Sequence, residues 1–243
     1  MDAWLSRRAL LGGTLGGGLL AAVETGAVPT FLEADPAAAA DVADVDQLRR
    51  SIKRLVRTRR QWRARHPRWR IEVLDRAPDH IVIHHTETPN TKLMSLSHAY
   101  ALSRQIQHFH MNGRGWNDIG QQLTISRGGH VMEGRQHSLS AILTGRHVLG
   151  AQTRHHNSHT IGIENEGTYT VARVPPRQWS ALVQTCSILC AAYGLNPYRA
   201  IVGHRDFNRT DCPGDVLYAR LPKLRRAVAA RLAGPRRHPG ADY

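Results

Sequence analysis

Apolar residues in this 243-residue chain occur as short strand-like runs and as longer helix-like repeats, which alternate along its central part. Runs rich in β-branched residues predict strands at 70–74, 79–84, 119–126, 148–152, 160–166 and 200–203, with a hairpin at 127–129 leading into a return strand at 130–133. Apolar residues three or four positions apart predict helices at about 45–66, 95–110, 175–193 and 217–232. This mixture predicts an α/β (α+β) fold in which a central mixed β-sheet is flanked by helices.

The first 40 residues differ in composition from the rest and are typical of an export signal. Ser6-Arg7-Arg8 forms a twin-arginine start, which an apolar, Gly-rich run to about Val23 and small residues to Ala40 follow. The apolar run is shorter than the roughly 20 apolar residues of a membrane span. We therefore expect a secreted or cell-envelope protein of a bacterium, exported by the twin-arginine route and without a transmembrane span in its mature form. An uncleaved anchor is the alternative.

The remaining chain has the length of one ordinary domain with extensions, which buries its own core. We divide the sequence into an export signal at 1–40, a basic and largely helical segment at 41–76, the main domain at 77–233 and a disordered tail at 234–243. No internal repeat is visible, and we expect a monomer.

The net charge of +14 is concentrated near the N-terminal side of the main domain. Between Arg49 and Arg70 the chain has eleven Lys and Arg residues and no Asp or Glu. Such a density favours polyanions, of which nucleic acid is the usual one. An exported chain meets wall polymers first, so we expect anionic wall polymers and no nucleic acid as partners. A solvated basic helix is the alternative interpretation.

Two histidines and a cysteine predict a metal site. His84 and His204 each stand at the end of a predicted apolar strand, and Cys212 lies in a Pro-Gly turn eight residues after His204. Two imidazoles and one thiolate give Zn²⁺ three ligands and leave a fourth position open, as in zinc hydrolases. The other cysteines, Cys186 and Cys190, share one face of a predicted helix, either as buried small residues or as an intrahelical disulfide.

Five motifs in order give the chain a family resemblance over roughly residues 78–232. They are Ile83-His84-His85-Thr86, Gly115-Trp116-Asn117-Asp118-Ile119-Gly120, Glu133-Gly134-Arg135, Asn157-Ser158-His159-Thr160-Ile161-Gly162-Ile163, and Gly203-His204-Arg205-Asp206 with Thr210-Asp211-Cys212-Pro213-Gly214-Asp215. Together they resemble the peptidoglycan recognition protein and type-2 N-acetylmuramoyl-L-alanine amidase family.

The resemblance implies zinc held by His84, His204 and Cys212. It also implies a zinc-dependent N-acetylmuramoyl-L-alanine amidase that acts on peptidoglycan or muropeptides. Its substrate is the amide between the lactyl group of N-acetylmuramic acid and the L-alanine of the stem peptide. A peptidoglycan-binding module without catalytic activity is the alternative, because some family members recognise muropeptides without cutting them. Non-catalytic relatives typically lose the cysteine ligand, which is intact here.

Two positions depart from the family pattern. Gln121 stands where many members have a catalytic Tyr, and Gln152 stands where many have a His. The bacterial branch of the family places a catalytic carboxylate in an Ile-Glu-x-Glu-Gly strand, which implies Glu164 as general base with Glu166 as the fallback. A Glu that only hydrogen-bonds to substrate or forms a salt bridge is the alternative for Glu164.

The remaining expectations concern substrate contacts and loops. The resemblance implies that Thr210 donates a hydrogen bond to the developing oxyanion, and capping of the Pro-Gly turn is the alternative. Substrate contacts are expected at Trp116, Gln121, Asn157 and Glu166. The alternative for Trp116 is a structural role in fixing the turn. We expect His85 to pack behind the site. The loop with His155, His156 and His159 invites a metal interpretation, but its turn residues favour a substrate-contacting or exposed loop.

Overall fold

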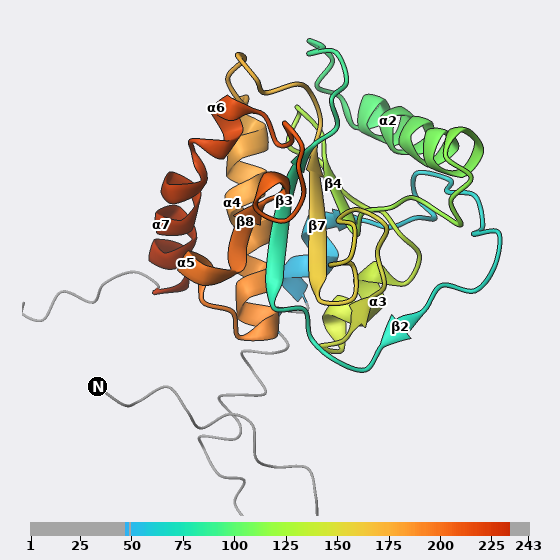
Figure 1. The fold of residues 1–243 in the computed structure, drawn as a ribbon, viewed down its shortest axis with the longest axis horizontal. Coiled ribbons are helices and arrows are strands. Elements are labelled where there is room, and N and C mark those ends of the chain that lie inside the picture. Colours follow the sequence, from blue (N-terminus) through green and yellow to red (C-terminus); the bar gives the residue numbers. More distant parts are fainter. Residues whose placement is uncertain (1–46, 49, 234–243) are drawn as a thin grey trace, which may run out of the picture.

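The computed structural model describes residues 47–48 and 50–233, and a six-stranded sheet lies at its centre (Figure 1). The strand order is β1-β5-β4-β7-β3-β8. Only the β4–β5 pair is antiparallel, so the sheet is mixed. Its strands are β1 (Val56–Arg57), β3 (His80–His85), β4 (Leu123–Ile125), β5 (Val131–Glu133), β7 (Thr160–Asn165) and β8 (Ile201–Gly203). A separate antiparallel pair joins β2 (Val73–Leu74) to β6 (His147–Val148).

Helices cover the sheet and confirm the predicted fold class. Figure 1 shows α4, α5 and α7 beside one another along one side of the sheet, with α2 on the other side. The helical elements are α2 (Leu96–His108), α3 (Ser138–Leu143), α4 (Pro176–Tyr193), α5 (Pro197–Ala200), α6 (Asp215–Tyr218), α7 (Leu221–Leu232), the π-helical turn η1 (Phe109–Gly113) and the 3₁₀ turn η2 (His204–Asp206).

Alternation along β3 and β7 separates an apolar face from a polar one. Ile81, Ile83, Ile161 and Ile163 are almost fully buried and belong to the same core as the buried side of α4. Because neighbouring residues of a strand point to opposite faces, His84 and the other even-numbered residues of β3 and β7 lie on the opposite face. His84 and Glu164 therefore point away from the α4 layer.

The N-terminal basic segment differs from its prediction. The described helix ends at residue 55, where β1 begins and pairs in parallel with β5, so the predicted helix to about 66 is wrong beyond that point. Trp62 is fully buried, and its Nε1 donates to the carbonyl oxygen of Glu133 over 2.8 Å. Arg59 forms a buried ion pair with Asp118 over 3.0 Å. These tertiary contacts override the helical periodicity of the segment.

Other elements follow the predictions with shifted bounds. Ser95 caps α2 by accepting from the backbone N–H of His98, as predicted. The strand predicted at 119–126 is limited to β4, and the one predicted at 148–152 is replaced by β6 in the small sheet. The predicted closing helix is divided into α6 and α7, because Pro222 favours the first turn of a new helix. Helix α3 was not predicted.

The predicted export signal and C-terminal tail lie outside the described residues, so both stay predictions, as do the domain boundaries. Among the helices that the structure describes, none combines the length and the apolar character that a membrane crossing needs.

Candidate metal centre

The structure brings together the three residues that the sequence predicts as ligands. The candidate donor atoms of His84, His204 and Cys212 all lie within 4.8 Å of one another. His84 Nδ1 lies 3.6 Å from Cys212 Sγ, and the rings of His84 and His204 have their centroids 4.4 Å apart. His84 is the last residue but one of β3, His204 directly follows β8, and these two strands are parallel neighbours.

The segment after His204 folds back so that Cys212 returns to the site. The backbone N–H of Arg205 donates to the carbonyl oxygen of Cys212 over 3.1 Å, and Arg205 Nη1 pairs with Asp215 Oδ1 over 2.7 Å. Gly214 adopts a φ of +85°, and a Cβ there would lie 2.3 Å from the carbonyl carbon of Tyr169. Only glycine fits this turn, which explains the Pro-Gly sequence directly after the cysteine.

A side-chain amide fixes which nitrogen of His84 faces the site. Gln152 Nε2 donates to Thr160 Oγ1 over 2.8 Å, which directs Gln152 Oε1 toward His84 Nε2 at 2.6 Å. An amide oxygen only accepts hydrogen bonds, so His84 Nε2 carries the proton. The lone pair of His84 therefore lies on Nδ1, the atom nearest Cys212 Sγ.

His204 has an equivalent amide partner. Asn208 Nδ2 donates to the carbonyl oxygens of Arg154 and Phe207 over 3.2 and 3.0 Å. Asn208 Oδ1 is thereby directed to His204 Nε2 at 3.1 Å, which makes His204 Nε2 the donor and leaves its Nδ1 as a lone-pair donor atom. Metal-ligating histidines generally donate their second ring N–H in this way.

Two contacts place Gln152 over β7. A Cβ at Gly162 would lie 2.8 Å from Gln152 Cγ and Cδ, so the glycine provides the space that this side chain occupies. Asn157 Oδ1 accepts from the backbone N–H groups of Gln152 and Thr153 over 2.7 and 3.0 Å, which closes the turn before β7. Gly162 of β7 therefore leaves the space that the Gln152 side chain of the neighbouring loop occupies.

Burial keeps all three candidate ligands uncharged. Burial, and next the charge of His204, lower the pKa of His84 to about 3, and burial also lowers the pKa of His204. Burial and the adjacent Glu164 raise the pKa of the Cys212 thiol, while the backbone N–H of His85 donates to its sulfur over 3.4 Å. Neutral imidazole lone pairs and a thiol that ionises beside a cation form a donor set that fits zinc.

Glu164 lies next to His84 on the polar face. The two residues are register partners on adjacent parallel strands, and Glu164 Oε2 is buried without a hydrogen-bond partner among the described residues. Burial raises the pKa of Glu164 to about 8. Glu166 differs, since Oε1 contacts His98 Nε2 at 2.5 Å and Oε2 accepts from the Arg127 backbone N–H. Of the two carboxylates, Glu164 has the free oxygen.

Other residues singled out in the sequence make contacts within the protein. Thr210 Oγ1 accepts from the Cys212 backbone N–H over 3.2 Å, as expected of a turn cap. Gln121 is fully buried and donates to Thr124 Oγ1 over 2.8 Å. The ring of Trp116 packs against that of His110 in a tilted arrangement, with centroids 4.5 Å apart. The roles predicted for these residues toward substrate stay predictions.

His85 and the two remaining cysteines lie outside the cluster. His85 Nδ1 accepts from the backbone N–H of Tyr169 over 3.2 Å, in line with its interpretation as a packing residue. Cys186 and Cys190 are buried free thiols in the α4 core, so packing is the correct alternative for them.

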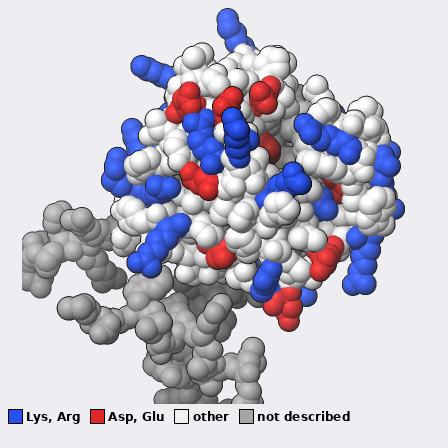
Figure 2. Space-filling view, viewed as in Figure 1, with Lys and Arg blue, Asp and Glu red and all other residues white. Residues whose placement is uncertain are grey.

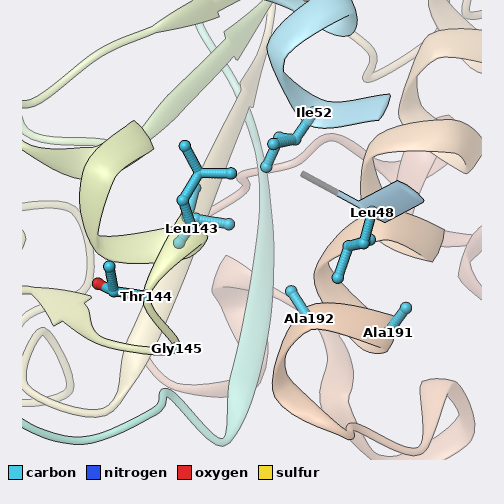
Figure 3. Close-up of a pocket in the computed structure, with 8 residues that line it drawn as sticks. Leu48, Ile52, Leu143, Thr144, Gly145, Ala191 and Ala192 are labelled. Carbon is cyan, nitrogen blue, oxygen red and sulfur yellow. The ribbon is translucent and has the colours of Figure 1, made fainter. Parts of the chain in front are cut away.

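An apolar concavity of about 240 Å³ lies elsewhere, between the N-terminal helix, α3 and α4 (Figure 3). Its lining has no titratable side chain and contains none of the predicted site residues; it consists of Leu48, Ile52, Ile142, Leu143, Thr144, Gly145, Ala191 and Ala192. This concavity therefore provides no acid, base or metal ligand.

Comparison with known proteins gives a consistent family match. Residues 74–215 match the family described as N-acetylmuramoyl-L-alanine amidase, Amidase_2. The chain is 36% identical to N-acetylmuramoyl-L-alanine amidase of Sus scrofa over 158 residues, which are 63% of this chain and 25% of that protein. It is 29% identical to peptidoglycan-recognition protein LB of Drosophila melanogaster over 68% of this chain and 66% of that protein. The chain thus spans about a quarter of the length of the mammalian relative.

Solved structures show the same fold. Wild-type Drosophila PGRP-LB has a TM-score of 0.60 with 27% identity, covering 68% of this chain and 91% of that one. A second solved structure is the ectodomain complex of peptidoglycan recognition proteins LCa and LCx with bound tracheal cytotoxin. Its TM-score is 0.61 with 26% identity, and the match covers 70% of this chain and 95% of that one.

The burial of Glu164 predicts a pH-dependent stability. Its pKa rises from 4.5 to about 8 on folding, so the folded metal-free protein retains a proton that the unfolded chain loses between these values. Stability should therefore fall as the pH rises from 4.5 to 8. At about 1.4 kcal/mol per pKa unit, the loss should amount to a few kcal/mol.

Glu164→Gln should lack this loss, because an amide does not titrate. The measurement is urea unfolding of both chelator-treated proteins at several pH values, taking the difference so that the titration of the histidines cancels. Parallel stability curves for the two proteins would show that Glu164 does not hold this proton.

Proposed function

Because the chain belongs to the Amidase_2 family, which groups N-acetylmuramoyl-L-alanine amidases with peptidoglycan recognition proteins, we propose that it is a zinc-dependent N-acetylmuramoyl-L-alanine amidase. It hydrolyses the amide between the lactyl group of N-acetylmuramic acid and the L-alanine of the stem peptide. One observation supports this most directly, namely the His84, His204 and Cys212 donor atoms within 4.8 Å of one another. A muropeptide ligand is supported by the relatives LCa and LCx, whose complex contains tracheal cytotoxin.

His84 and His204, each through Nδ1, and Cys212 through Sγ would hold the zinc. When bound there, zinc polarises the carbonyl of the scissile amide as a Lewis acid. The backbone N–H of His85, 3.4 Å from Cys212 Sγ, stabilises the thiolate form of the cysteine.

Glu164 moves the proton of the reaction. Its buried Oε2, which has no hydrogen-bond partner among the described residues, takes a proton from the water that attacks the carbonyl. The same oxygen then delivers the proton to the departing amine nitrogen of L-alanine. A carboxyl whose pKa is raised to about 8 by burial both accepts and releases a proton near neutral pH. Thr210 accepts a hydrogen bond from Cys212 N–H, and its own hydroxyl proton is directed to the carbonyl oxygen of the substrate.

Gln152 positions a metal ligand. It accepts from His84 Nε2–H and thereby holds the ring in the tautomer that presents Nδ1 to the site. We assign it this positioning role in place of the histidine that many family members have there.

The protein works at the cell envelope after twin-arginine export, and its basic segment binds anionic wall polymers. Several arginines of this segment are exposed, whereas Arg59 is paired with Asp118 inside the fold. On the face seen in Figure 2, Lys and Arg side chains outnumber the acidic ones and are spread over most of the outline.

Activity is tested by mass spectrometry of purified peptidoglycan digested with the zinc-loaded full chain. We expect free stem peptides that begin at L-alanine from the wild type, and none from Cys212→Ala. Glu164→Gln should retain zinc but lose about 10²-fold or more in rate, the usual contribution of a general base. Cys190→Ala, which removes a buried thiol of α4, is the matched control and should leave peptide release unchanged. Binding of zinc and peptidoglycan without release would instead support a recognition module.

The role of Gln152 predicts a defect in metal affinity. Gln152→Ala should weaken zinc binding about 10- to 100-fold, as loss of an outer partner of a ligating histidine generally does. Gln152→Glu keeps an acceptor oxygen and should restore most of the affinity. Competition with a chromogenic chelator measures both, with Gln105→Ala on the exposed side of α2 as control. Unchanged affinity in Gln152→Ala would reject the positioning role.

Wall binding is tested by neutralising exposed charges, because deletion of the segment would remove core residues such as Trp62. The variant changes Lys53, Arg54, Arg60 and Arg63 to Gln and leaves Arg59 intact. Its binding to isolated cell walls should weaken several-fold at low salt, and wild-type binding should weaken as salt rises. The control neutralises four exposed charges at the other end of the chain, namely Arg199, Lys223, Arg226 and Arg231. Equal loss in both variants would assign binding to net charge alone.

A further inference from the structure

A second group of metal-binding side chains lies at the beginning of β3 and β7, on the face that carries the first site. The candidate donor atoms of Asp79, His80 and His159 lie within 4.8 Å of one another. His80 Nδ1 is 2.6 Å from Asp79 Oδ1, and His159 Nδ1 is 2.8 Å from the same oxygen. Two imidazoles therefore converge on one carboxylate.

The fold holds these three residues in place. The backbone N–H of Asp79 donates to the carbonyl oxygen of His159 over 2.9 Å, and His80 is the register partner of Thr160 at the start of the parallel β3–β7 pair. The ring of Phe207 packs edge-on against both imidazoles, at centroid distances of 5.4 Å to His80 and 6.0 Å to His159. Main-chain pairing and an aromatic wall thus set the positions and orientations of the donors.

His159 has the outer partner that a ligating histidine requires. Its Nε2 lies 3.0 Å from His156 Nδ1, and the His156 ring stacks on Phe207 with centroids 4.3 Å apart. Ligation through His159 Nδ1 lets Nε2–H donate to His156, the arrangement found around metal-bound histidines. Burial raises the pKa of Asp79, but hydrogen bonds from His159 and His80 outweigh it and lower that pKa overall, so the carboxylate is ionised at neutral pH.

We propose that Asp79, His80 and His159 form a second binding site, one for a divalent transition-metal ion such as Zn²⁺, distinct from the His84 cluster. Two imidazole nitrogens and a carboxylate oxygen are a donor set that such ions accept. Ligation uses the lone pair of each Nδ1, so each imidazole carries its proton on Nε2 when the ion is bound, and protons compete with the ion for these nitrogens. Asp79 is largely exposed, which leaves the remaining coordination positions to water.

Two features make this site weaker than the first. All three donors are partly or largely exposed, whereas His84 is buried. The guanidinium of Arg76 donates to the carbonyl oxygen of Ser158, next to His159, and its positive charge opposes a cation.

The second site lies about 13 Å from the first, because His80 and His84 are four residues apart on one strand. A chain of hydrogen bonds joins the two sites through Gln152 and Thr160, whose hydroxyl donates to the carbonyl oxygen of His156 over 2.8 Å. An ion bound at His159 restricts the motion of the loop that carries Gln152. The second ion therefore supports the geometry of the first.

The test is a zinc count by equilibrium dialysis on the full chain without a polyhistidine tag at neutral pH. Wild type should bind two equivalents, Cys212→Ala should retain the weaker one, and His159→Ala should retain the tighter one. Asp79→Asn, which keeps size and shape, should weaken the second equivalent at least 10-fold without a change in circular dichroism. His155→Ala, an exposed neighbour in the same loop, is the matched control and should bind two.

One equivalent in the wild type, or two in His159→Ala, would overturn the proposal. Loss of the second equivalent in the His155→Ala control would overturn the ligand assignment. Because Cys212→Ala reports on the second ion in the absence of the first, this result is independent of whether the protein is an amidase.

Discussion

The parallel pairing of β3 with β7 is the constraint on which the rest of the molecule depends. The register sets His80 beside Thr160 and His84 beside Glu164, so that the second pair lies four residues further along the same two strands. Because side chains alternate, the isoleucines of both strands enter the core under α4, and His80, His84 and Glu164 lie on the opposite face. A shift of one residue in this pairing would bury the histidines in the apolar core and expose the isoleucines. The same interaction that stabilises the core therefore places the chemistry.

Much of this arrangement is encoded locally and was predicted from the sequence. His84 and His204 stand at the ends of runs rich in β-branched residues, which predict strands, and the Pro-Gly turn after Cys212 indicates a sharp reversal. Two parallel neighbouring strands end at the same edge, so their terminal histidines meet. The family was confirmed by comparison, and the fold class was confirmed by the structure.

What the sequence did not predict depends on contacts between distant segments. Nothing in the local sequence around Asn208 indicates that its amide oxygen accepts from His204, since Asn208 is fixed by a carbonyl oxygen 54 residues away in the chain. The predicted helix to residue 66 failed for a similar reason, because Trp62 donates to Glu133, 71 residues further on. Periodicity reports which side chains are apolar, but not which partner segment buries them.

The departure from the family pattern at position 152 has a physical consequence. A histidine there would exchange donor and acceptor character as it titrates near neutral pH. The amide oxygen of Gln152 accepts at every pH, and the donation of its Nε2 to Thr160 prevents the amide from turning over. The tautomer of His84 is therefore set by a group that does not ionise, in a site where burial already keeps both imidazoles neutral. Gly162 is needed for this arrangement of Gln152 and His84, because any side chain at position 162 would occupy the space of Gln152.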